Sequence, residues 1–147
     1  MDAQVDLSTA ECTEFLGTGG TGVLALGTKN GDPPYAIPVS YGYDGQNEQL
    51  YFRLATGPDR GKGRVTDRQA TFVTFAVTKA RWTSVIAKGV LEETTRSEIA
   101  VETLDGLERV FIPYIDMFGE SLQDVEFTFV RLDPETLDGR TEAFSSA

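Results

Sequence analysis

The sequence predicts a mainly β fold with short helices, arranged as a six-stranded antiparallel barrel. Six segments carry strand signals, and tight turns that favour hairpins join several of them. The helical signals are short, and a closed barrel leaves no edge strands exposed to aggregation. With 147 residues and 40% hydrophobic content, we expect one domain over residues 1–147 with a packed core, and loosely ordered ends at 1–8 and 141–147.

A short helix is expected over residues 9–16. Ser8-Thr9-Ala10-Glu11 matches a capping box, Leu7 and Cys12 are spaced for a hydrophobic staple, and Gly17-Thr18-Gly19-Gly20 ends the helix. Cys12 is then a small core residue, because a buried cysteine without a basic neighbour is unreactive.

The expected strands follow this helix. They cover residues 23–28, 35–43, 50–54, 71–77, 82–91 and 126–132. Asn30-Gly31 predicts a type I′ hairpin and Asp44-Gly45 a second turn, whereas Pro38 interrupts the second strand and Gly89 breaks the fifth.

A second helical stretch lies between the last two strands. Thr95-Arg96-Ser97-Glu98 matches another capping box, and one face of the stretch gathers Ile99, Thr103, Leu104 and Leu107. The acidic, small-residue tail after Asp138 is expected to be loosely ordered.

The charge balance argues against nucleic acid as a partner. The chain has 23 acidic and 13 basic residues, for a net charge of -10, and such a surface repels phosphate backbones. Only four of the basic residues are lysines: Lys29, Lys62, Lys79 and Lys88. Excess acid with scarce lysine is typical of a halophilic surface, although an ordinary acidic protein has the same composition.

The composition also excludes several kinds of site. Without histidine the chain cannot form a Ser-His-Asp or Cys-His triad, an imidazole zinc site or histidine-ligated haem. A single cysteine excludes an internal disulfide and a cysteine metal cluster, so no metal site is expected. Catalysis must then use carboxylates, Tyr, Lys, Arg, backbone groups or a cofactor.

We expect a cytoplasmic chain without a membrane partner. Its longest apolar runs, such as Val23-Leu24-Ala25-Leu26, are too short to span a bilayer. The N-terminus lacks the basic and apolar regions of an export signal.

Pro38-Val39-Ser40-Tyr41 is a first candidate site, because a proline inside a strand cannot donate to a ladder. One interpretation is an edge strand or a bulge. The other is a backbone segment left unpaired so that its N–H and C=O groups bond a flat heterocycle. The sequence fits both.

A second candidate site is the basic segment from Arg53 to Lys62, which stands out in an acidic chain. Arg53 can bond a phosphate bidentately, Lys62 can act as a point charge, and the backbone of Gly61-Lys62-Gly63-Arg64 can open a helix toward the anion. The spacing is not that of a P-loop. The alternative is a solvated loop whose cations pair with surface carboxylates. Trp82, the only tryptophan, is more typical of a core or an interface than of ligand stacking.

Taken in order, these segments resemble a known family. The runs are residues 34–45, Leu50-Tyr51-Phe52-Arg53, Gly61-Lys62, Ala70-Thr71-Phe72-Val73, Trp82-Thr83-Ser84-Val85, Gly89, Leu132-Asp133-Pro134 and Gly139-Arg140. Together they resemble the pyridoxamine 5′-phosphate oxidase-like family from about Thr9 to Arg140, and within it the short flavin-nucleotide-binding branch that includes the nitroimidazole-resistance proteins.

The resemblance implies a split β-barrel homodimer that binds flavin mononucleotide (FMN) at the subunit interface. Residues matching Pro38, Val39, Ser40 and Tyr41 meet the flavin ring through backbone groups. Those matching Arg53, Leu54, Thr56, Gly61 and Lys62 hold the phosphate, and Trp82 and Ser84 match the segment offered by the other subunit. The function implied is an FMN-dependent oxidoreductase acting on an unidentified small molecule.

Two alternatives stay open: a flavin-binding carrier or sensor without turnover, and a reductase that uses the deazaflavin F420 on the same fold. The nitroimidazole-resistance branch has a histidine near the flavin, where this chain has Phe52-Arg53. The residues that pyridoxamine-phosphate oxidases use for their substrate phosphate are also missing. No residue is assigned as acid or base, and Tyr41 and Tyr43 are expected to be structural.

Overall fold

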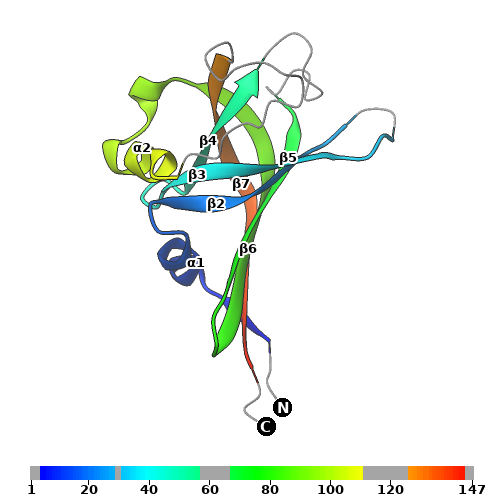
Figure 1. Ribbon diagram of the computed structural model, residues 1–147, viewed down its shortest axis with the longest axis vertical. Helices are drawn as coiled ribbons and strands as arrows, with labels where there is room; N and C mark the ends of the chain where they lie inside the picture. The colour runs from blue at the N-terminus through cyan, green and yellow to red at the C-terminus, as the bar shows by residue number, and fades with distance from the viewer. Residues whose placement is uncertain (1–3, 29–30, 57–66, 111–125, 145–147) are drawn as a thin grey trace.

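The computed structural model describes residues 4–28, 31–56, 67–110 and 126–144 (Figure 1). In chain order its elements are β1 (Val5–Leu7), α1 (Thr9–Leu16), β2 (Gly19–Leu26), β3 (Tyr35–Asp44), β4 (Gln49–Thr56), β5 (Gln69–Val77), β6 (Arg81–Thr94), a 3-10 turn (Arg96–Glu98), α2 (Val101–Glu108) and β7 (Glu126–Ala143). In these parts of the chain, no helix is long and apolar enough to cross a membrane.

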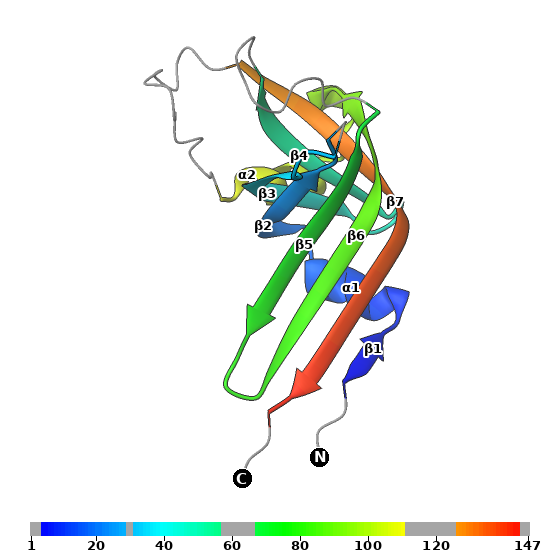
Figure 2. The ribbon, with the colours of Figure 1, turned by 90° about the vertical axis from the view of Figure 1, so that its right-hand side faces the viewer.

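Six strands close into an antiparallel barrel, as predicted. Their order is β7-β4-β3-β2-β5-β6, and pairing of β6 with β7 closes the circle. β1, which the sequence patterns did not reveal, pairs with the outer edge of β7. The ends of β5, β6 and β7 extend past the barrel beside β1 (Figure 2).

The first helix begins and ends where the capping signals place it. The Ser8 hydroxyl accepts a hydrogen bond from the Glu11 N–H, and the Glu11 carboxylate accepts one from the Ser8 N–H. Cys12 and Leu16 are buried. Burial raises the pKa of the Cys12 thiol, and the nearby charges of Asp138 and Glu11 add to that shift. Cys12 is therefore a core residue, as predicted.

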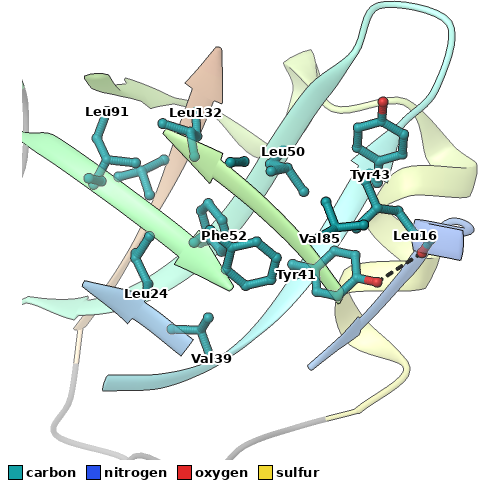
Figure 3. Packing of buried hydrophobic residues seen from close by; sticks show 14 of the residues in the cluster. Leu16, Leu24, Val39, Tyr41, Tyr43, Leu50, Phe52, Val85, Leu91 and Leu132 are labelled. Atoms are coloured by element: carbon teal, nitrogen blue, oxygen red, sulfur yellow. Dashed lines mark hydrogen bonds between the residues drawn. The ribbon is translucent and has the colours of Figure 1, made fainter. Parts of the chain in front are cut away.

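The main core fills the barrel with alternate residues from its strands (Figure 3). Phe72 is central to it. Its ring centroid lies 5.1 Å from that of Tyr41 and 5.1 Å from that of Phe52, in edge and tilted contacts that aromatic pairs favour. Leu24, Leu50, Val85, Leu91, Val130 and Leu132 are fully buried around these rings.

Helix α2 lies directly on the backbone of β2 and β3. A Cβ atom at Gly42 would be 2.5 Å from the Thr103 carbonyl oxygen, and one at Gly19 would be 2.3 Å from the Gly106 carbonyl oxygen. A smaller cluster forms beneath the helix from Tyr51, Ile99, Leu107, Leu104 and Phe129. The predicted apolar face is therefore the buried one, and glycines permit the close contact.

The predicted capping box at Thr95 is wrong. Residues 96–98 form a 3-10 turn, and the Thr95 hydroxyl lies 3.1 Å from the Ser97 hydroxyl instead of bonding the first turn. Helix α2 begins after Ala100, whose side chain cannot cap. The box motif is local, and Ile99, just before the helix, is packed into the cluster.

Several expected strand limits were also wrong. β2 begins at Gly19 rather than at residue 23, and residues 27–34 connect it to β3, so no two-residue hairpin joins these strands. Asn30 lies outside the described residues. β3 runs through Pro38 without interruption, whereas β6 has the irregularity expected near Gly89. A Cβ atom there would be 2.4 Å from the Asp133 carbonyl oxygen.

The described residues near both ends of the chain lie in strands, although loose ends were expected there. Residues 139–143 belong to β7, which continues to Ala143 because β6 pairs with it on one side and β1 on the other. Residues 5–7, within the expected loose N-terminal end, form β1. Gly139 permits this arrangement, since a Cβ atom there would be 2.5 Å from the Cys12 sulfur.

A candidate flavin-type site where two strands separate

Within the closed barrel, β3 and β4 pair with each other over only part of their length. These strands pair from Tyr41↔Phe52 to Asp44↔Gln49. Beyond that point residues 35–40 pair with β2, and residues 53–56 pair with β7. The two strands therefore separate (Figure 1), and in the described structure their pairing with each other stops at Tyr41↔Phe52. We call residues 35–40 and 53–56 the seam.

The first predicted site segment lies on this seam and alternates between core and surface. Val39 and Tyr41 are buried, Pro38 is exposed and Ser40 is half-buried. Pro38 is in register with Val23 of β2, so it marks an open edge and not a bulge. Because these residues do not pair with β4, the edge is also compatible with the ligand interpretation.

Tyr41 is held inside the protein. Its hydroxyl donates a hydrogen bond of 2.9 Å to the Leu16 carbonyl oxygen (Figure 3). Burial raises the pKa of Tyr41 to about 12, although nearby Arg109 acts to lower it. The side chain therefore supports the core, and any contact of Tyr41 with a ligand must use its backbone.

Arg53 is the first residue of β4 beyond the pairing with β3. Its guanidinium lies 5.1 Å from the Phe127 ring centroid, and its Nη1 atom is 3.8 Å from the Glu108 carboxylate. Its side chain is 20% exposed, so its charge is partly shielded from water and its field is less screened than at the surface. The neighbouring Leu54 side chain is buried in the core and leaves only backbone atoms for a ligand.

Residues at the end of α2 and just after it contact both sides of the seam. On the β3 side, the Ser40 hydroxyl donates a hydrogen bond of 2.5 Å to the Val110 carbonyl oxygen. On the β4 side, Glu108 faces Arg53. Sequence patterns missed Glu108 and Val110, since both reach the seam through the packing of α2.

Other predicted site residues lie elsewhere. Gly61 and Lys62 fall outside the described residues. Thr56 ends β4, opposite Glu126. Trp82 and Ser84 are on β6, opposite Val77 and Phe75 of β5, and two strands separate β6 from β3. Within one chain they are not brought to the seam.

The seam thus combines two chemical features. Its backbone edges offer donors and acceptors in a line, which suits the polar edge of a flat heterocycle. Arg53 offers a partly buried guanidinium, which suits a phosphate or another oxyanion. These features fit a flavin nucleotide.

Comparison with family models identifies the family to which the chain belongs. Residues 8–141 match the family model described as pyridoxamine 5′-phosphate oxidase. The chain belongs to the pyridoxamine 5′-phosphate oxidase family. No curated protein matches it.

Solved structures share the fold. An FAD-binding protein from Mycobacterium smegmatis is 18% identical with a TM-score of 0.66, and the match covers 96% of this chain and 100% of that one. An FAD-binding protein from Mesorhizobium loti is 22% identical with a TM-score of 0.64, covering 99% and 100%. A candidate 5-nitroimidazole antibiotic resistance protein from Bacteroides thetaiotaomicron is 18% identical with a TM-score of 0.65, covering 97% and 90%. This family member therefore has the split-barrel fold, as predicted.

Proposed function

We propose that this chain is a flavoprotein that binds FMN along the seam and acts as an oxidoreductase on a small molecule. The observation that supports the proposal most strongly is the seam itself. Strands β3 and β4 stop pairing at Tyr41↔Phe52 and separate beside a partly buried arginine. This occurs in a chain of net charge -10 that belongs to the pyridoxamine 5′-phosphate oxidase family.

Different residues of the seam would bind the ring and the phosphate of FMN. The backbone of residues 38–41 would meet the polar edge of the ring. Arg53, the backbone of Leu54 and Thr56, and the loop residues Gly61 and Lys62 would hold the phosphate. FMN supplies the redox chemistry when bound, and the protein supplies placement and electrostatics. Positive charge near the N1–O2 edge would favour the reduced, anionic ring.

We further propose that the active form is a homodimer. Trp82 and Ser84 pair with Glu142 and Arg140, whereas the seam residues of β4 pair with residues 126–129 at the other end of β7. A second copy would therefore have to supply Trp82 and Ser84 to the seam. Their sheet face also carries exposed apolar side chains, among them Val23 (44%), Phe75 (68%) and Val77 (63%). Burial of this face against a second copy would remove these side chains from water.

A second cofactor deserves a direct test. Two solved structures with this fold are FAD-binding proteins, so FAD is an alternative to FMN at the same seam. The deazaflavin F420 is a further alternative. Histidine-ligated haem is excluded because the chain contains no histidine.

Absorption spectroscopy tests the proposal. The protein is purified in high salt, its spectrum is recorded, and any chromophore released by heat is identified by chromatography. We expect one FMN for each chain. Released FAD or F420 would replace FMN in the proposal, whereas a colourless protein that also fails to bind added FMN would contradict it.

Turnover separates an oxidoreductase from a carrier. The FMN-loaded protein is mixed with NADH or NADPH and oxygen, and the rate of nucleotide oxidation is compared with that of free FMN at equal concentration. We expect a faster rate with the protein. Tight binding with no acceleration by either reductant would favour a carrier or sensor.

A further inference from the structure

Glu108 contacts two arginines from different parts of the chain. Arg96, in the 3-10 turn before α2, donates from Nη1 to Oε2 at 2.8 Å and from Nη2 to Oε1 at 3.0 Å. Arg53 approaches the same carboxylate from β4, with its Nη1 atom 3.8 Å from Oε2. Glu108 therefore lies between an exposed arginine and the arginine of the seam.

The two contacts differ in strength. Arg96 bonds both carboxylate oxygens at hydrogen-bond distance, the bidentate geometry that gives the strongest pairing of these groups. The Arg53 contact is longer than a hydrogen bond and involves one oxygen. The negative charge of Glu108 is thus mainly matched by Arg96, while the Phe127 ring holds the Arg53 guanidinium from another side.

We propose that Arg96 is a positioning residue for the anionic end of the seam ligand. By holding both oxygens of Glu108, it prevents that carboxylate from closing on Arg53. The Arg53 guanidinium can then exchange its long contact with Glu108 for a phosphate. This inference rests on the proposed binding of FMN at the seam, and it assigns a role to a residue outside the seam.

A double-mutant cycle measures this role. Dissociation constants for FMN and riboflavin are obtained by flavin fluorescence quenching with the wild type, Arg96→Gln, Glu108→Gln and the double variant, at one salt concentration. Riboflavin lacks the phosphate, so the ratio of the two constants isolates the anionic end. Arg131→Gln is the matched control, because Arg131 pairs with a different carboxylate, that of Glu92.

We expect Arg96→Gln to weaken FMN binding about tenfold with Glu108 present, which corresponds to about 1.4 kcal/mol, and less than twofold in the Glu108→Gln background. Arg96→Gln should change riboflavin binding less than twofold, and Arg131→Gln should change FMN binding less than twofold. If Arg96→Gln folds poorly, Arg96→Lys can replace it. Lysine keeps the positive charge but cannot bond both carboxylate oxygens as the guanidinium does, so FMN binding should weaken by an intermediate amount.

Two results would overturn the role proposed for Arg96. An equal effect of Arg96→Gln in both backgrounds would mean that Arg96 acts only through its own charge, and an equal effect on riboflavin would mean that it acts only on structure. Either result overturns the inference while the wild type still prefers FMN. A wild type that binds FMN no better than riboflavin would instead overturn the proposed phosphate site, and this inference with it.

Discussion

Gly106 of α2 lies so close to Thr18 that a Cβ atom on the glycine would be 1.9 Å from the Thr18 carbonyl oxygen. The same end of the helix is tied to Thr18 a second time, because Arg109 donates a hydrogen bond of 2.8 Å to the Thr18 hydroxyl. These contacts fix where α2 ends. They therefore fix where Glu108 meets Arg53 and where Val110 meets Ser40, on the two sides of the seam.

Gly106→Ala should displace α2 and weaken flavin binding together. The added methyl group cannot fit against a backbone oxygen, so we expect a loss of at least about 2 kcal/mol in the free energy of unfolding. Thermal and urea denaturation measure the loss, and an FMN titration measures the effect on the seam. Gly27→Ala is the control, since a Cβ atom there would be 3.3 Å from its nearest neighbour. Equal stability of the two variants would refute this role of Gly106.

Tyr41 predicts a dependence of stability on pH. Its pKa is raised to about 12 in the folded protein, against an ordinary value near 10 in the unfolded chain. The unfolded state therefore loses the proton first, and stability falls as pH rises from about 10 toward 12. Tyr41→Phe should flatten that fall. Burial also raises the pKa of Tyr43 and Tyr51, so part of the slope remains.

At neutral pH, Tyr41→Phe has a separate cost. It leaves the Leu16 carbonyl oxygen without its side-chain donor, which should cost about 1 kcal/mol. Urea denaturation at pH 7 and at several pH values above 9 measures both effects. If stability falls with pH equally steeply in the wild type and in Tyr41→Phe, Tyr41 does not cause that fall. FMN affinity should be unchanged, because the hydroxyl lies in the core.

The proposed dimer face predicts a sharp contrast between two exposed valines. Val77 on β5 is 63% exposed and Val101 on α2 is 69% exposed, so neither substitution by glutamate should disturb the core. Val77→Glu places a charge on each side of the proposed interface and should dissociate the dimer, whereas Val101→Glu should not. Sedimentation velocity distinguishes these states. Identical behaviour of the two variants would argue against this face.

Salt should stabilise the dimer. Each copy carries a net charge of -10, so two copies repel one another, and added salt screens that repulsion. We expect sedimentation to detect dimers in 2 M KCl and increasing dissociation after dilution into low salt. A monomer at both salt concentrations would contradict the proposal.

Local patterns predicted those parts of the fold that depend on near neighbours. The capping box of α1 and the alternation of β5 needed only a few adjacent residues, and both were found where expected. The box at Thr95 shows the limit of such patterns, since a motif that suits a helix start was used in a 3-10 turn. The extra length of β7 also escaped prediction, because it depends on pairing with β1 and β6.

The candidate site was predictable only in part. Pro38 and Arg53 stood out because each is unusual where it occurs, a proline inside a strand and a cation in an acidic chain. Their relationship was not visible, since the seam arises from the point at which β3 and β4 stop pairing. Glu108 and Arg96 carry no local signal, and the placement of α2 brings them to the site.

The role of Arg53 as a phosphate ligand is tested most directly by comparing FMN with riboflavin. Dissociation constants are measured by fluorescence quenching for the wild type and Arg53→Gln, with Arg131→Gln as a control for lost charge beside β4. We expect the wild type to bind FMN at least about tenfold more tightly than riboflavin, because a charge-assisted hydrogen bond contributes about 1.5–3 kcal/mol. Arg53→Gln should abolish most of that preference. A preference that survives in Arg53→Gln, or that is absent from the wild type, would contradict a phosphate site at Arg53.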